Sequence, residues 1–380
     1  LHGDLVLQGQ ADMDLDVDAL RQMLRRARAH GLVEVRGALV LDRSAFVPTR
    51  SDIGAPPFDD ATEFGYNVIP DALLVDDNLL RLELFVDARG LQVVPLTPLA
   101  GVRVSHAMQL VEGDCSTWED GWQPPLVHPA GLLRQQEVVL RGDWPLGCAR
   151  TLALNVLERD DFIASLLRQL ADELGIHWRG AVREGVALPT ARLLAEHTSR
   201  PLAELVRAIN KPSDNVFTRT LYLALGQAAS GAPEEPTRQR AERAVRSWLR
   251  EHGIADTGLV LDNGSGLSRS ERITALQLVA VVRAGLASRW APEFLASLPI
   301  AGVDGTLRRR MTEGPAAGRA RLKTGGLRNV VSLAGVVPDA GGQPLAVAIV
   351  FNSNDHRPAA LRPLADAIVD WIAQQHFVPH

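Results

Sequence analysis

Apolar and polar residues alternate along much of the first half of the chain. Residues 79–87, LLRLELFVD, place apolar side chains on one face and charged ones on the other, which predicts a half-buried strand. Further strands are expected at 5–7, 34–42, 90–96, 102–111 and 136–142. A helical period predicts helices over 16–30 and 160–174, which end at Gly31 and Gly175. With a Pro- and Asp-rich loop at 48–63, this half is mixed and mainly β.

The second half of the chain is helical first and then turns to strands. Helical spacing covers 201–228, with a break at Pro212, and continues over 237–252. Strands are expected at 319–325, 329–337 and 344–351, before a helix over 360–374. The short turns between these strands indicate antiparallel neighbours. We therefore expect an α+β fold with an antiparallel sheet flanked by helices.

Composition excludes several classes of protein. The 380 residues are 46% hydrophobic and 22% charged, which is typical of a folded chain with more than one domain and not of a disordered one. A net charge of −5 offers no general basic face, so we expect no nucleic-acid partner. No apolar run reaches the ~18 residues of a membrane helix, so no membrane span is expected.

Only two of the 40 cationic side chains are lysines, Lys211 and Lys323. Arginine stays charged near neutral pH, whereas a lysine can shift its pKa and transfer a proton. Lysines that remain in such an Arg-rich chain are therefore candidates for chemistry, although chance survival at solvated positions explains them equally well.

Lys323 belongs to the run Lys323-Thr324-Gly325-Gly326, which we place at the end of a strand, entering a tight turn. This run offers an ammonium, a hydroxyl and an unobstructed backbone N–H to a carboxylate or an oxyanion. Alone, so short a run is more often an ordinary turn.

Lys211 precedes a Ser-Asp-Asn sequence at the break between two helical stretches. Ser213 and Asn215 are two residues apart, so a loop can direct both into one cleft. The alternative is a simple helix N-cap, because Ser, Asp and Asn are all favoured there.

Together these runs resemble a known family. Ser-Asp-Asn, followed about 110 residues later by Lys-Thr-Gly on an antiparallel strand with a C-terminal helix, is the pattern of penicillin-recognising serine acyl-enzymes. The chain is similar to the class C penicillin-binding proteins of low molecular mass, the D-alanyl-D-alanine carboxypeptidases and endopeptidases of peptidase family S13. Three further segments resemble motifs of this family: Leu1–Leu5 (LHGDL), Asp262–Arg269 (DNGSGLSR) and Ala301–Leu307 (AGVDGTL).

The resemblance implies a catalytic group of Ser213, Asn215 and Lys323. Ser213 would pass protons to the leaving amine. Lys211 would adjust the local field beside it and belong to the substrate-binding residues. Asn215 would bind the substrate's peptide backbone and the lysine that assists acylation. Lys323 and Thr324 would hold the terminal carboxylate of D-Ala.

Other substrate contacts are implied less directly. In the turn, Gly325 and Gly326 would face the substrate, and the N–H of Gly326 would form half of an oxyanion hole. Arg269 would meet a carboxylate elsewhere on the stem peptide. Asp60 would bind a free amine of its diamino acid, and a solvated loop acid is the simpler alternative for Asp60.

The resemblance also implies a domain organisation. Residues 1–185 would be inserted β-rich domains, two of them nested. Residues 186–380 would be the C-terminal part of a serine β-lactamase/transpeptidase-like domain. Peptidoglycan stem peptides would be the substrates and β-lactams the inhibitors, with no metal and no cofactor.

One departure from the family is serious. Its nucleophile is the serine of a Ser-x-x-Lys motif, and here positions 208 and 320, three before the lysines, are both Ala. The nearest imitation, Ser165 to Arg168, ends in an arginine that cannot act as a base. In the family this motif precedes the LxGDL strand. We therefore expect the nucleophile helix and a signal peptide to lie in a missing N-terminal part, and these 380 residues to be an inactive fragment of a periplasmic enzyme.

Export of the protein would affect the oxidation state of its two cysteines. The spacing of Cys115 and Cys148 is compatible with inert thiols or with one disulfide, and an oxidising compartment favours the disulfide.

Three other classes of protein are alternatives to this family. A serine β-lactamase or esterase with a Tyr-x-Asn site is disfavoured, because Asn follows neither Tyr66 nor Tyr222 at the second position. A metal hydrolase is disfavoured because the ten histidines form no HExxH motif. A non-catalytic scaffold of the same fold, which binds peptidoglycan or a partner, remains the alternative.

Overall fold

The structure is a computed structural model that describes residues 1–130, 135–353 and 358–377. The chain forms two compact units, Leu1–Ser199 and Arg200–His380. The segment after β12 belongs to the first unit, and the domain division expected at 185/186 stays a prediction. Among the described residues, no helix is both long and apolar enough to cross a bilayer.

The first unit contains a small α/β layer. Its parallel sheet has the order β1-β3-β12, from β1 (Leu5–Gln8), β3 (Leu39–Asp42) and β12 (Val182–Glu184). The helices α1 (Val17–Ala29) and α2 (Arg159–Glu173) contact one another beside it. Asp16 caps α1 by accepting a hydrogen bond from the N–H of Ala19, and the apolar stripe of α1 is buried.

The expected strand at 34–42 is wrong as a single element. It divides into β2 (Glu34–Val35), which pairs with β11 (His177–Trp178), and β3, which belongs to the other sheet. The break occurs at Gly37, where a Cβ would lie 2.5 Å from the carbonyl oxygen of Gly3. Only a glycine permits this approach, and the chain therefore changes sheets here.

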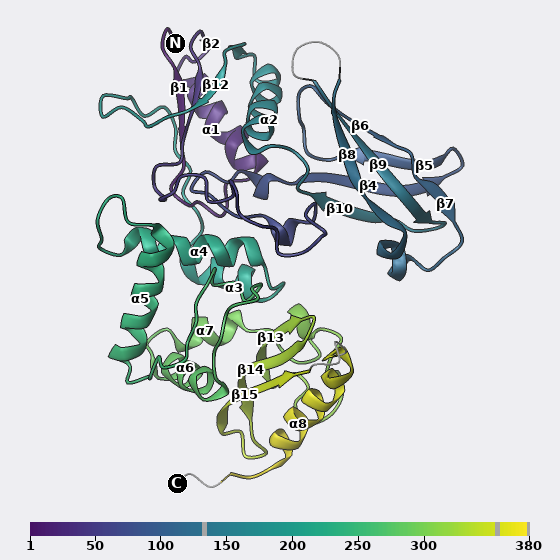
Figure 1. Cartoon of the computed structure of the whole chain (residues 1–380), viewed down its shortest axis with the longest axis vertical. Coiled ribbons are helices and arrows are strands. Elements are labelled where there is room, and N and C mark those ends of the chain that lie inside the picture. The colour runs from purple at the N-terminus through teal and green to yellow at the C-terminus, as the bar shows by residue number, and fades with distance from the viewer. Residues whose placement is uncertain (131–134, 354–357, 378–380) are drawn as a thin grey trace. The chain divides into compact units, whose positions relative to one another are not determined.

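A β-rich segment is inserted between β3 and α2. It forms two sheets, one of the order β10-β4-β5 and one in which β9 pairs with β6, β7 and β8 (Figure 1). The strands are β4 (Leu80–Asp87), β5 (Gly90–Pro95), β6 (Val102–His106), β7 (Gln109–Val111), β8 (Trp122–Pro129), β9 (Gln136–Pro145) and β10 (Arg150–Leu154). The chain leaves the parallel sheet after β3 and returns to it at β12. The nested inserted domains expected from the resemblance stay a prediction.

Two features of this segment differ from expectation. The strand expected at 102–111 is two strands, β6 and β7, which are separated at Ala107 and Met108 and pair with β9 in the same register. The strand β8 was not expected, because Pro124 and Pro125 conceal it, and the register of β8 on β9 shifts beside them, between Gln123 and Leu126. The Sγ atoms of Cys115 and Cys148 form a disulfide in this segment.

The second unit combines helices with an antiparallel sheet of order β13-β14-β15 (Figure 1). The strands are β13 (Arg321–Leu327), β14 (Val330–Pro338) and β15 (Pro344–Asn352). The helices are α3 (Leu202–Asn210), α4 (Asn215–Ala228), α5 (Thr237–Glu251), α6 (Ala275–Ala287), α7 (Ala291–Ser297) and α8 (Arg362–Gln374). The expected antiparallel pairing of all three strands is confirmed.

The core of this unit lies against one face of the sheet. Leu322 and Leu333 pack with Val369 of α8 in a buried cluster. Because side chains alternate along a strand, Lys323 lies on the opposite face of the sheet.

Candidate active site

Ser213 lies in the short loop between α3 and α4, where Pro212 interrupts the helical pattern. Its backbone has a φ of 67°, in the left-handed region that few non-glycine residues occupy. Asp214 caps α4 by accepting a hydrogen bond of 2.8 Å from the N–H of Phe217. The capping role expected as the alternative for this segment therefore belongs to Asp214, and Ser213 and Asn215 lie on either side of it.

Lys323 contacts this loop directly. Its Nζ donates a hydrogen bond of 2.5 Å to Ser213 Oγ and another of 2.9 Å to the carbonyl of Thr324. Burial lowers the pKa of Lys323 to about 8, since desolvation disfavours the ammonium. The two runs found in the sequence, 110 residues apart, thus meet in one site that holds a hydroxyl and a lysine able to titrate near neutral pH.

The expectation that Lys323 ends a strand is wrong. Lys323 and Thr324 lie inside β13, opposite Ala334 and Leu333, and the strand continues to Leu327. Gly325 permits this continuation close to β14. A Cβ on Gly325 would lie only 2.3 Å from Ser332 Oγ.

A third segment, Ala301–Leu307, holds the two runs in place. Asp304 accepts hydrogen bonds of 2.8 and 2.7 Å from Lys211 Nζ and one of 2.8 Å from the N–H of Ile300. Burial acts to raise the pKa of the Asp304 carboxyl, but these hydrogen bonds bring it below its ordinary value. The N–H of Thr306 donates to the carbonyl of Lys211 at 3.0 Å, and Thr324 Oγ1 donates to Thr306 Oγ1 at 2.9 Å.

Asp304 and Thr306 are the residues whose contribution the sequence analysis missed. In the sequence this segment, Ala301–Leu307, stands out only because it resembles a motif of the family. The signal was an acid and a hydroxyl on either side of Gly305, but nothing in their spacing identified Lys211 and Thr324 as their partners.

Lys211, two residues before Ser213, has its partners in another segment of the chain. Its Nζ donates to the carbonyl of Leu298 at 2.6 Å as well as to Asp304, and it contacts the 298–304 segment. These contacts favour a role in positioning the Ser213 loop. Its expected contact with substrate stays a prediction.

The remaining candidates are more exposed. Asn215 is the first residue of α4 and is half-buried. Gly325, Gly326 and Arg269 are exposed in the same unit. Asp60 is exposed in the first unit, where its neighbour Asp59 accepts hydrogen bonds from Tyr66 and Asn67. Contacts therefore join Ser213, Lys323 and Thr324, and Thr306 links Thr324 to Lys211.

This constellation can do acid–base chemistry at a carbonyl substrate. A lysine with a pKa near 8 can hold an anionic group when charged and accept a proton when neutral. The Ser213 hydroxyl lies beside it, and the hydroxyl of the next residue, Thr324, bonds to Thr306.

Comparison with known proteins identifies the family and the fold of this chain. The sequence pattern of the D-Ala-D-Ala carboxypeptidase 3 (S13) family matches residues 1–375, and the chain belongs to that family. It is 31% identical over 390 residues to a D-alanyl-D-alanine carboxypeptidase of Actinomadura sp. (strain R39), a match that covers 98% of this chain and 69% of the relative. It is 27% identical over 354 residues to D-alanyl-D-alanine carboxypeptidase DacB of Haemophilus influenzae, covering 93% of this chain and 72% of that one.

A solved structure has the same fold. The crystal structure of penicillin binding protein 4 (dacB) from Haemophilus influenzae matches with a TM-score of 0.77 at 23% identity, and the match covers 98% of this chain and 82% of that one. A second crystal structure of that protein, complexed with a novel β-lactam, matches with a TM-score of 0.69 over 97% of this chain and 82% of that one. The resemblance to class C penicillin-binding proteins and the α+β fold class are thereby confirmed.

Proposed function

We propose that this protein removes the terminal D-Ala from peptidoglycan stem peptides as a serine-type carboxypeptidase, and that it also cuts cross-links as an endopeptidase. The observation that carries the proposal is the hydrogen bond of 2.5 Å between Lys323 and Ser213. It brings together an ammonium and a hydroxyl, the groups that binding of a terminal carboxylate and protonation of a leaving amine require. The names of the relatives, D-alanyl-D-alanine carboxypeptidases, support this substrate class.

Each residue has a defined task in the proposed reaction. Lys323 and Thr324 bind the terminal carboxylate, and the N–H of Gly326 faces the developing oxyanion. Ser213 Oγ passes a proton to the nitrogen of the departing D-Ala while Lys323 supports it electrostatically. Lys211 and Asp304 keep Ser213 within reach of Lys323.

The experiment uses the native protein, meaning the whole protein to which these 380 residues are proposed to belong. It measures the release of D-Ala from a stem pentapeptide by this protein and by its Lys323→Met variant. We expect release by the native protein and a loss of about 10²-fold or more in kcat/KM for the variant. Equal rates for both would show that Lys323 takes no part in the reaction.

The 380-residue chain by itself is proposed to be inactive. Neither of its lysines has a serine three positions before it, so the nucleophile and its base are not among these residues. We expect no covalent adduct when this chain is incubated with benzylpenicillin. A stoichiometric penicilloyl adduct, mapped by mass spectrometry to any of its serines, would contradict this part of the proposal.

The site of action follows from the substrate. Peptidoglycan lies outside the cytoplasmic membrane, so we propose that the protein works in the periplasm and that β-lactams inhibit it. A non-catalytic scaffold is the second candidate. It would bind peptidoglycan without releasing D-Ala.

A further inference from the structure

The first unit contains a polar cavity to which the proposed reaction assigns no role. Its volume is about 360 Å³, within the range of small-molecule sites. Three segments line it: the loop from Arg50 to Ile69, the turn at Asn78, and the residues from Asn155 to Arg159 that lead into α2. Ala55, Pro57, Ile69 and Leu157 give it an apolar part, and three asparagines give it a polar one.

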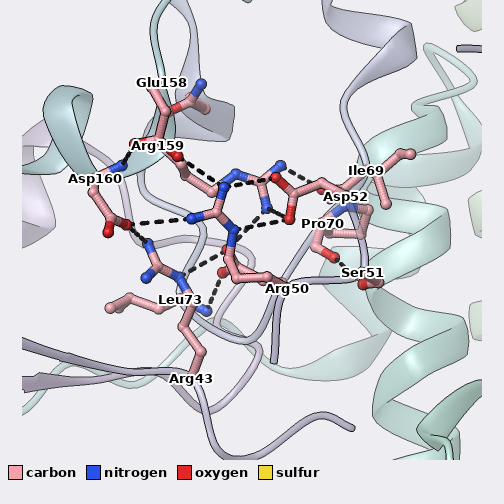
Figure 2. Close-up of polar contacts among 12 residues, drawn as sticks. Arg43, Arg50, Ser51, Asp52, Ile69, Pro70, Leu73, Glu158, Arg159 and Asp160 are labelled. Atoms are coloured by element: carbon pink, nitrogen blue, oxygen red, sulfur yellow. Dashed lines mark hydrogen bonds and ion pairs between the residues drawn. The ribbon is translucent and has the colours of Figure 1, made fainter. Parts of the chain in front are cut away.

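The charged wall of this cavity is fully paired (Figure 2). Arg50 donates to the Asp52 carboxylate at 2.9 and 2.8 Å and to Glu158 at 2.8 Å. Arg159 donates to Asp71 at 2.8 Å and to the carbonyl of Ile69 at 2.5 Å. Two arginines thus face carboxylates that already neutralise them, and the wall has no surplus charge for an ionic ligand.

A third arginine, Arg43, fixes this wall through buried ion pairs. Arg43, 2% exposed, forms ion pairs with Asp71 at 2.9 Å and with Asp160 at 2.8 Å. These contacts join the end of β3, the loop before β4 and the start of α2 (Figure 2). The cavity therefore has preformed walls, which lowers the entropic cost of binding.

Asn78 is the residue that points to a ligand. It is 3% exposed and has a φ of 58°, after two other residues, Asp76 and Asp77, that also have positive φ. Three successive left-handed residues other than glycine are costly, and such strain persists mainly where function requires it. The Nδ2 of Asn78 donates to Asn155 Oδ1 at 2.9 Å and to the carbonyl of Leu157 at 3.0 Å, which fixes the amide.

The carbonyl oxygen of this amide has no donor. Within residues 1–130, 135–353 and 358–377, neither Asn78 Oδ1 nor Asn67 Oδ1 accepts a hydrogen bond, although both are buried. An unsatisfied buried acceptor costs about 1–3 kcal/mol. Two of them beside one cavity favour a ligand that brings N–H and O–H donors.

We propose that this cavity binds one N-acetylated sugar of the peptidoglycan glycan strand. Such a sugar is neutral, carries hydroxyl and acetamide donors for Asn67 and Asn78, and has an apolar ring face and methyl group for Ile69 and Leu157. The termini of a stem peptide are charged, and the paired arginine wall offers them no counter-charge. This inference rests on the proposed peptidoglycan substrate and adds the glycan to it.

The test measures binding of the β-1,4-linked disaccharide of N-acetylglucosamine to the full 380-residue chain. Saturation-transfer NMR and calorimetry are the two readouts. Thr62 lines the cavity and is exposed, so Thr62→Trp fills the cavity without touching the ion pairs. We expect this variant to weaken binding about tenfold or more. Thr151→Trp, at an exposed position of β10 outside the cavity, is the matched control and keeps the original affinity.

Several results would overturn the inference. They are no saturable binding by the unaltered chain, equal binding by the two tryptophan variants, and displacement of the disaccharide by a pentapeptide that ends in D-Ala-D-Ala. Binding is measured without turnover. Disaccharide binding in a protein that never releases D-Ala would therefore contradict the proposed reaction alone, and D-Ala release without disaccharide binding would contradict this inference alone.

Discussion

Lys323 is a lysine whose buried position changes its protonation. Burial lowers its pKa from 10.5 to about 8 in the folded chain. Between these two values the unfolded chain binds the proton and the folded chain does not, so the free energy of unfolding rises with pH across this window. The destabilising effect of the buried ammonium is fully present below pH 8.

The first prediction concerns this linkage. Relative to Lys323→Met, the unaltered chain should gain stability as the pH rises from 8 to 10.5. Urea unfolding of both proteins at several pH values measures the difference. Parallel curves for the two proteins would show that Lys323 titrates normally.

The second prediction concerns the Lys211–Asp304 pair. Lys211→Met leaves the Asp304 carboxylate without its ion-pair partner, so we expect a loss of about 1–3 kcal/mol in the free energy of unfolding. Asp304→Asn retains hydrogen-bonding capacity and should cost less. A double-mutant cycle should give a coupling energy of at least ~0.5 kcal/mol, as expected for residues in contact. Simple additivity would contradict the pairing.

At the scale of single residues, the sequence predicted Ser213, Asn215 and Lys323 as catalytic candidates, because short polar runs can be recognised without knowledge of the fold. It did not reveal that Asp304 and Thr306 hold them together. Those contacts span 93 and 18 residues, to Lys211 and Thr324, and no local pattern encodes them.

Among the elements of the fold, the turn at Gly305 brings the 301–307 segment against the Ser213 loop. Gly305 has a φ of 57°, and a Cβ there would lie 2.6 Å from the carbonyl oxygen of Lys211. The segment can approach the loop only because this position has no side chain.

The third prediction follows from that approach. Gly305→Ala should lower the free energy of unfolding by more than about 1 kcal/mol and should reduce D-Ala release by the native protein. Gly318→Ala is the control, because Gly318 has a φ of 69° with no atom within 4 Å of the Cβ position. It carries the backbone cost without the clash. Equal effects of the two substitutions would show that close approach at Gly305 is unimportant.

The predicted helices and most predicted strands were confirmed because their apolar periods are long and end at Gly or Pro. The failures have local physical causes. Pro124 and Pro125 conceal β8, and Gly37 divides one expected strand between two sheets. Periodicity reports which residues are apolar, but not where a strand leaves one sheet for another.

Across the whole molecule, the chain divides into two units with separate cores. The insertion in the first unit contains the disulfide between Cys115 and Cys148, which are 33 residues apart. On the chain-entropy account, a loop of this length contributes roughly 3–4 kcal/mol.

The fourth prediction concerns this division. Replacing both cysteines by serine should lower the unfolding midpoint of the first unit and leave that of the second unchanged. Hydrogen exchange read separately in residues 1–199 and 200–377 measures the two. Equal destabilisation of both units would mean that they unfold as one cooperative body.

The central claim is that this sequence belongs to a serine acyl-enzyme that recognises D-Ala-D-Ala, and intact mass spectrometry tests it most directly. The native protein is measured before and after incubation with benzylpenicillin. The account predicts one added penicilloyl group per molecule, mapped outside these 380 residues, since no serine in them precedes a lysine by three positions. An unchanged mass of the native protein would contradict the account and favour the non-catalytic scaffold.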